Sequence, residues 1–203
     1  MSGKRGEVSC IILAGGKNTR MGREKAFLRI GERTIIEEQK DTLKKIFDEI
    51  IIVTNNHSYF HNLDVKVVKD IIPHCGPLGG LYSGLSVCSN IHGFLIGCDM
   101  PFPSISLINY MIKKIKKNDI VIPVSSRGLE PLFAIYSLNC LETIKRHLEM
   151  KDLKISNVLN YHRVSYVSPR EVKKFDPHEF SFLNVNTPEE YEQGLKIWLK
   201  RKE

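Results

Sequence analysis

A glycine-rich, positively charged loop follows the first apolar run of the sequence. The run VSCIIL (8–13) leads into AGGKNTRMGREK, with two adjacent glycines followed by Arg20 and Lys25. Glycines let a backbone approach a ligand closely and present N–H groups to an anion. An arginine can grip phosphate oxygens with its planar guanidinium, and a lysine adds a compact positive charge. These residues favour polyphosphate binding over a tight turn whose charged side chains are merely solvated.

The spacing of the loop differs from that of two common phosphate-binding motifs. No Gly-Lys-Ser or Gly-Lys-Thr follows the glycines, so the loop is not a Walker P-loop. No GxGxxG is present either, which excludes the usual dinucleotide fingerprint. A nucleotide bound here must therefore be held by a different kind of loop.

A single aspartate, Asp99, ends the apolar run GFLIGCD (93–99), and Pro101 stops the expected strand just behind it. Hard cations such as Mg²⁺ take carboxylate oxygens together with phosphate oxygens and waters. Asp99 is therefore a candidate metal ligand, and the alternative is a cap on the helix expected from residue 104. The sequence reads Asp-Met-Pro, so the DxD motif of sugar-transferring enzymes is absent, which disfavours a glycosyltransferase.

Strand-like and helix-like segments alternate along the chain. The expected strands are 8–13, 49–53, 65–70, 93–99, 119–124, 129–137 and 163–167. The expected helices are 34–47, one within 76–89, 104–117, 138–149, 152–160 and one starting at Pro188. Thr187 is the expected N-cap of the last helix, and Glu190 closes a capping box. This alternation predicts an α/β fold with a single three-layer, Rossmann-like domain over residues 1–203 and a mostly parallel sheet. Ligands of such sheets bind beyond the carboxyl ends of the strands.

Composition limits the class of protein and its partners. The chain has 203 residues, a net charge of +7 and no apolar run close to the ~20 residues of a membrane span. Five scattered cysteines without CxxC spacing argue against disulfides or a zinc site and for a reducing cytoplasm. His57 and His61 have the spacing of metal ligands but lack an HExxH context, and KKIKK (113–117) reads as a solvated helix face. We therefore expect anionic small-molecule partners, with no nucleic acid and no membrane.

Several motifs together indicate a family. The string LAGGxxxRMGxxK resembles the signature of the small GT-A-like nucleotidyltransferases, and within them the chain resembles the molybdenum cofactor guanylyltransferases. The other matching stretches are GPLGGLYSGL (76–85), CDMPF (98–102), EPLFAIY (130–136) and NVNTPEEY (184–191). The resemblance implies Mg²⁺-dependent transfer of GMP from GTP to molybdopterin or Mo-molybdopterin. The products would be the guanine dinucleotide cofactor and pyrophosphate.

The resemblance also implies roles for individual residues. Arg20, Lys25 and Asp99 are the expected catalytic residues, with Asp99 holding the metal. The expected GTP-binding residues are Leu13, Ala14, Gly15, Gly16, Lys25, Thr54, Asn55, Asp70 and Asp99. The expected pterin-side residues are Gly79, Asn184 and Asn186. Thr54 departs from family members that carry asparagine there. Asp70 and the two asparagines could instead simply bond their own turns.

Alternative functions stay open at the level of the sequence. One is a cytidylyltransferase or another nucleotidyltransferase acting on a different phosphorylated substrate. Another is a non-catalytic nucleotide-binding module, although Arg20, Lys25 and Asp99 together disfavour a pure binder. The resemblance further implies cofactor-delivery or acceptor proteins as partners, whose identity the sequence does not reveal.

Overall fold

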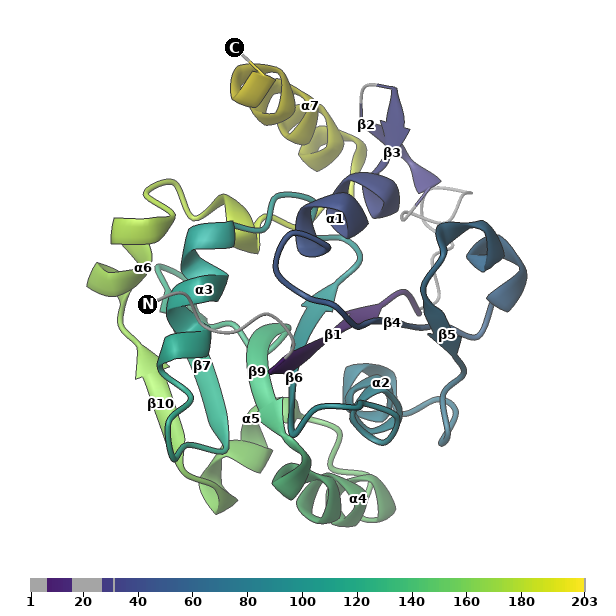
Figure 1. The fold of residues 1–203 in the computed structure, drawn as a ribbon, viewed down its shortest axis with the longest axis vertical. Coiled ribbons are helices and arrows are strands. Elements are labelled where there is room, and N and C mark those ends of the chain that lie inside the picture. The colour runs from purple at the N-terminus through teal and green to yellow at the C-terminus, as the bar shows by residue number, and fades with distance from the viewer. Residues whose placement is uncertain (1–6, 16–26, 31, 203) are drawn as a thin grey trace.

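A mixed eight-stranded sheet forms the centre of the molecule (Figure 1). The computed structural model describes residues 7–15, 27–30 and 32–202. The strands of the sheet are β1 (Val8–Leu13), β4 (Ile50–Val53), β5 (Lys66–Val68), β6 (His92–Gly97), β7 (Ile120–Ser125), β8 (Gly128–Leu129), β9 (Phe133–Ser137) and β10 (Val164–Val167). Their order is β10-β7-β9-β6-β1-β4-β5, and β8 pairs with β7. The predicted α/β fold is confirmed.

Strand direction follows the prediction except around β9. The pairs β1–β4, β1–β6, β4–β5 and β7–β10 are parallel. β9 runs antiparallel to both β6 and β7, because it enters the sheet from the short hairpin at β8 and not through a helix. The sheet is therefore mostly parallel, and β9 begins at the edge where β6 and β7 end.

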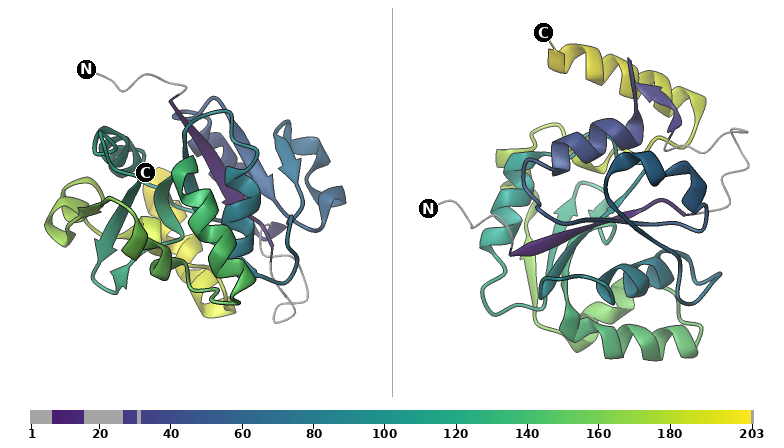
Figure 2. Two further views of the ribbon diagram at one scale, coloured as in Figure 1. Left: turned by 90° about the horizontal axis from the view of Figure 1, so that it is seen from below. Right: turned by 45° about the vertical axis from the view of Figure 1, so that its right-hand side comes forward.

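Helices cover both faces of the sheet and give three layers (Figure 2). One face carries α1 (Ile35–Leu43), α3 (Ile105–Lys113) and α6 (Pro169–Phe175), and the other carries α2 (Gly76–Leu85), α4 (Leu141–Glu149) and α5 (Ile155–Val158). Each face has its own apolar core, and β1 contributes alternate residues to both: Ile12 to the first and Ile11 to the second. The central strands are buried on both sides, as their unbroken apolar sequences predict.

Glycines bring α2 unusually close to β1. A Cβ placed on Gly84 would lie 2.4 Å from Ile11 Cγ2, and one on Gly80 would lie 2.8 Å from Leu13 Cδ2. A Cβ at either position would force the strand side chain or the helix to shift. The start of α2 is thereby held beside the carboxyl end of β1, where the glycine loop begins.

Several elements differ from the expected boundaries. α1 ends at Leu43 because the chain turns there, although Ile46 and Phe47 are still buried. The hairpin of β2 (Arg29–Ile30) and β3 (Arg33–Thr34) and the helix α6 were not predicted. α6 does carry a signal, since Ser168 and Glu171 form a capping box. Lys114 and Tyr110, from the α3 region, both donate to the Glu171 carboxylate, and these hydrogen bonds lower the pKa of that carboxyl to about 2.

The C-terminal helix α7 (Pro188–Lys202) begins as predicted. Glu190 N donates to Thr187 Oγ1 at 3.2 Å, and Thr187 N donates back to the Glu190 carboxylate at 3.1 Å. Tyr191, Leu195 and Trp198 pack together against a small third core, which confirms that they share one face. In the described part of the chain, no helix combines the length and the apolar character needed to cross a membrane.

Candidate nucleotide site

The carboxyl ends of four parallel strands are aligned at one edge of the sheet. Leu13 lies opposite both Val53 and Gly97, and Val53 lies opposite Val68. Ala14 N donates to Val53 O at 2.9 Å, and Cys98 N donates to Leu13 O at 3.0 Å. The predicted site residues that follow these strand ends are Ala14, Gly15, Thr54, Asn55, Asp70 and Asp99. The fold therefore gathers them on one edge, while Gly16, Arg20 and Lys25 lie outside the described residues.

Asn55 and Asp70 form a reciprocal pair across this edge. Asn55 Nδ2 donates to Asp70 Oδ2 at 2.9 Å, and Asp70 N donates to Asn55 Oδ1 at 3.4 Å. The carboxylate of Asp70 thus bonds a neighbouring loop. Thr54 is almost fully buried, and its hydroxyl accepts from Asn56 N at 3.1 Å. Asn55 is the more exposed of the two candidates for contact with a base, and both roles stay predictions.

Asp99 occupies a tight turn just past β6. Met100 N donates to Gly97 O at 3.2 Å, which closes the turn around Asp99. A Cβ on Gly97 would lie 2.5 Å from Asp99 Oδ1, so the carboxylate folds back over a glycine that has no side chain to obstruct it. The N-cap of α3 is Ser104, whose hydroxyl accepts from Leu107 N. The alternative in which Asp99 caps that helix is therefore wrong.

Asn184 lies next to Asp99 although the two are far apart in sequence. Val185 N donates to Asp99 O at 2.8 Å, which fixes the segment before α7 against the turn. Asn184 Oδ1 is buried and has no hydrogen-bond partner among the described residues. The backbone N–H of Asn186 instead donates to Glu190, at the start of α7. Asn184 directly precedes the residue that bonds the Asp99 backbone, and a buried amide oxygen without a partner is a ligand that suits a hard cation.

No cluster of three or more His, Cys, Asp or Glu side chains suitable for a metal occurs in the described part of the chain. Mg²⁺ does not require one, because it is commonly held by one or two carboxylates together with substrate phosphates and waters. Asp99 and Asn184 therefore fit a site that nucleotide phosphates would complete.

The hairpin between β7 and β8 holds the chain that leads to Asn184. Arg127 donates to Phe182 O, and Ser126 N donates to the Glu179 carboxylate at 3.1 Å. Glu130 directly follows β8, and its carboxylate accepts a hydrogen bond from Ser125 Oγ at 2.6 Å. Burial raises the pKa of the Glu130 carboxyl. Glu130 is the first residue of the stretch EPLFAIY, whose match to the family did not by itself point to a role for this carboxylate.

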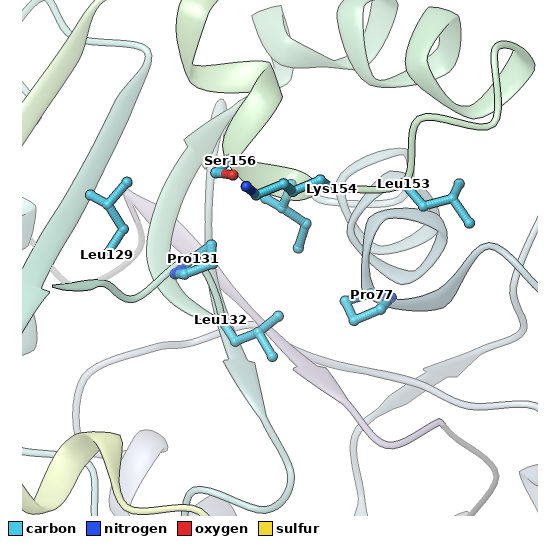
Figure 3. Close-up of a pocket in the computed structure, with 8 residues that line it drawn as sticks. Pro77, Leu129, Pro131, Leu132, Leu153, Lys154 and Ser156 are labelled. Carbon is cyan, nitrogen blue, oxygen red and sulfur yellow. The ribbon is translucent and has the colours of Figure 1, made fainter. Parts of the chain in front are cut away.

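A pocket lies beside the N-terminus of α2 (Figure 3). Its volume is about 470 Å³. Its lining residues are Pro77, Leu129, Pro131, Leu132, Leu153, Lys154, Ile155 and Ser156. Tyr136 is fully buried in β9, and its hydroxyl donates to Pro131 O at 2.8 Å, which fixes the loop before that strand. The pocket is mainly apolar, with one positive charge from Lys154.

Gly79 is buried inside α2 and does not line this pocket. A Cβ at Gly79 would lie 2.8 Å from Cys75 Cβ and 3.2 Å from Ile72 O. The absence of a side chain at Gly79 therefore lets the loop before α2 pack closely on the helix. Gly76, at the start of α2, has a φ of 57°, which favours glycine. Contact of Gly79 with a pterin stays a prediction.

Comparison with known proteins identifies the family. The MobA-like NTP transferase domain matches residues 10–165. A "Probable molybdenum cofactor guanylyltransferase" from Natranaerobius thermophilus is 41% identical over 93% of this chain and 95% of its own length. A "Molybdenum cofactor guanylyltransferase" from Desulfosudis oleivorans is 37% identical over 92% and 94% of the two chains.

Solved structures share the fold. Molybdopterin-guanine dinucleotide biosynthesis protein A from Archaeoglobus fulgidus superposes with a TM-score of 0.82 over 95% of this chain and 99% of that one, at 23% identity. A protein from Aquifex aeolicus superposes with a TM-score of 0.73 at 27% identity, over 90% of this chain and 94% of that one. The resemblance drawn from the sequence motifs is thus confirmed: the chain belongs to the MobA-like NTP transferase family and is a nucleotidyltransferase of the molybdenum cofactor guanylyltransferase type.

Proposed function

We propose that this enzyme transfers GMP from GTP to the terminal phosphate of molybdopterin or Mo-molybdopterin, acting as a single domain over residues 1–203. The observation that carries the proposal is the row of Ala14, Gly15, Asn55, Asp70 and Asp99 at one sheet edge. The names of the relatives supply the identity of the two substrates. A cytoplasmic location and cofactor-delivery or acceptor proteins belong to the same proposal.

The strand order divides the site into two halves. The loops after β1, β4 and β5 lie on one side of Asp99, and they carry the candidate residues for the nucleotide. β9, β7 and β8 lie on the other side of β6, together with the pocket beside α2. Asp99 stands between the two halves, where the α-phosphate of one substrate must meet the phosphate of the other. We assign the first half to GTP and the second to the acceptor.

The chemistry needs positive charge and donors more than a base. An oxygen of the acceptor phosphate attacks the α-phosphorus, the bond to the β-phosphate breaks, and pyrophosphate leaves with the bonding electrons. The attacking phosphate is already ionised at neutral pH, so no general base is assigned. Backbone N–H groups of Leu13, Ala14, Gly15 and Gly16 would hold the triphosphate, and Arg20 and Lys25 would neutralise the leaving pyrophosphate.

A divalent metal ion completes the charge balance of the proposed site. Enzymes of this family generally use such an ion, and we propose Mg²⁺, held by Asp99 with Asn184 beside it. Bound there, the ion would supply charge neutralisation at the α-phosphate. Asp99 and Asn184 would keep that neutralisation at the boundary between the two halves of the site.

The apolar pocket suits the flat, mostly carbon-and-nitrogen ring system of the acceptor. Pro77 of α2 and Leu132 of the β8–β9 loop provide apolar walls, and Lys154 provides a charge that complements an anionic substrate (Figure 3). The pocket begins at the N-terminus of the same helix that packs on Leu13, so it adjoins the nucleotide half of the site. We therefore place the acceptor rings in this pocket.

Product formation tests the proposed function directly. Purified protein mixed with Mg²⁺, GTP and molybdopterin is expected to release pyrophosphate and to form the guanine dinucleotide cofactor. Omission of either substrate is expected to abolish both products. Formation of a cytosine dinucleotide instead, or of neither dinucleotide, would contradict the proposal.

Thermal stabilisation tests the choice of base. A ligand stabilises the native state by RT ln(1 + [L]/Kd), about 2.7 kcal/mol at a hundredfold excess over Kd. We expect GTP to raise the melting temperature more than ATP, CTP or UTP at equal concentrations. Equal shifts with all four nucleotides would mean that the site recognises only phosphate. A larger shift with CTP would place the enzyme with the cytidylyltransferases.

Filling the pocket tests the acceptor half. Ser156 is a half-buried lining residue on α5, so Ser156→Trp is expected to occupy much of the space without entering either core. We expect the KM for molybdopterin to rise at least ~10-fold, about 1.4 kcal/mol, with the GTP-induced melting shift unchanged. Asn160→Trp is the control, because Asn160 is exposed and does not line the pocket. An unchanged KM for molybdopterin in Ser156→Trp would remove the pocket from the acceptor site.

A further inference from the structure

Gln39 is a fully buried polar residue in the middle of α1. Its side-chain Nε2 lies 2.8 Å from Gly97 O and 2.8 Å from Met100 O. Both of these carbonyl oxygens are acceptors, so only the two N–H groups of the amide can face them. One side chain from α1 therefore bonds the backbone on both sides of Asp99.

The amide of Gln39 is not what packing alone would place there. The neighbouring inward residues of α1, Ile36 and Leu43, are apolar and fully buried in the same core. Gln39 Oε1 is also buried and has no hydrogen-bond partner among the described residues. A buried polar atom without a partner is costly, and the two bonds to the turn offset part of that cost. They do so while contributing nothing to the hydrogen bonds within α1.

The two carbonyls bonded by Gln39 belong to the turn that carries Asp99. Gly97 and Met100 are the ends of the turn, and the Asp99 carboxylate rests over Gly97. Val185 N holds the turn from the other side through Asp99 O. The turn around Asp99 is thus held by Gln39, by Val185 and by its own bond from Met100 N to Gly97 O, and Gln39 supplies two of these hydrogen bonds.

We propose that Gln39 is a positioning residue for the reaction. It fixes the Gly97–Met100 turn so that the Asp99 carboxylate is already oriented for a divalent cation before substrate binds. A preorganised ligand loses less freedom when it binds, which strengthens the interaction. The inference rests on the proposed role of Asp99 as a metal ligand. Among the described residues α1 is the first α-helix after Gly15, so the same contact ties this early helix to the turn that carries Asp99.

Metal affinity in Gln39→Leu tests the proposal without relying on turnover. Leucine keeps similar volume and apolar packing but removes both donors. With GTP present, we expect the Kd for Mn²⁺, followed by electron paramagnetic resonance, to rise at least ~10-fold. The Mg²⁺ concentration for half-maximal activity should rise in parallel. The melting shift caused by GTP in EDTA should not change, since that binding does not depend on the Asp99 carboxylate.

Leu43→Ala is the matched control for lost stability. Leu43 lies one turn further along the same face of α1, is fully buried, and does not contact the turn through a hydrogen bond. This variant is expected to lower the melting temperature while leaving the Mn²⁺ affinity unchanged. Gln39→Met, with an unbranched side chain of the same length, is measured in the same way and replaces Gln39→Leu if the latter does not fold.

The outcomes separate the inference from the proposed function. Unchanged Mn²⁺ affinity in a folded Gln39 variant would overturn the inference. An equal loss of Mn²⁺ affinity in Leu43→Ala would also overturn it, as would absence of Mn²⁺ binding by the wild type. A Gln39-dependent Mn²⁺ affinity without GMP transfer would support the positioning role and contradict the proposed function. Normal GMP transfer with Gln39-independent Mn²⁺ affinity would overturn the positioning role alone.

Discussion

Replacing Lys25 with alanine is expected to lower the rate of GMP transfer by ~10²–10³ with little change in stability. Loss of one preorganised donor to a developing anion typically costs this much. Lys25 is the last residue of the polar segment AGGKNTRMGREK, so its side chain is not an expected core residue. We therefore expect the melting temperature of the free protein to stay near that of the wild type, and the measurement is the steady-state rate at saturating GTP and molybdopterin.

Lys17→Ala is the matched control for Lys25→Ala. It removes the same charge from the same loop, at a position that the family signature leaves variable. If only the total positive charge of the loop mattered, both variants would lose activity to a similar extent, and that loss would depend strongly on salt concentration. A specific contact with the triphosphate affects Lys25→Ala alone. Retention of most of the activity by Lys25→Ala would remove this lysine from the site.

Part of the proposed nucleotide half of the site was predictable because local sequence determines where the strands end. Apolar runs identify the strands, and in a parallel sheet the residues after each run meet at one edge. The strand pattern therefore predicts that Gly15 and Asp99 lie at this edge, whereas the roles of Asn55 and Asp70 are implied by the family resemblance. The pairing of Asn55 with Asp70 could not be predicted, since it depends on the side-chain conformations of two loops.

The rest of the site depends on contacts between segments distant in sequence. The segment of Asn184 lies against the Asp99 turn through one backbone hydrogen bond, from Val185 N to Asp99 O. Nothing in the local sequence of either segment indicates this contact. Gln39 lies within the helix expected over 34–47, but only the structure shows that it is buried and which carbonyls it bonds. The pocket likewise needs β9 to run antiparallel, a direction that the extended pattern at 129–137 does not encode.

Replacing Asp99 with asparagine is expected to lower GMP transfer by at least ~10²-fold, roughly 2.7 kcal/mol of barrier, while the fold is kept. Asparagine has the same shape, so it should still fit over Gly97, but it removes the charge that attracts a divalent cation. GTP binding in the absence of metal should persist, because the glycine loop, Arg20 and Lys25 do not need that carboxylate. The measurements are the transfer rate across a Mg²⁺ titration and the melting shift with GTP in EDTA.

The control for this variant is Asp64→Asn, which removes the same charge at a side chain that is 98% exposed and far along the chain from β6. Asparagine tolerates the left-handed backbone at Asp64, where φ is 50°, so the control should fold normally. If net charge alone mattered, both variants would shift the Mg²⁺ dependence alike. If Asp99 holds the metal, only Asp99→Asn requires more Mg²⁺, and saturating Mg²⁺ restores part of its rate. An unchanged transfer rate in Asp99→Asn at limiting Mg²⁺ would mean that Asp99 does not hold the metal. The positioning role proposed for Gln39 would then be wrong as well, because it rests on metal binding by Asp99.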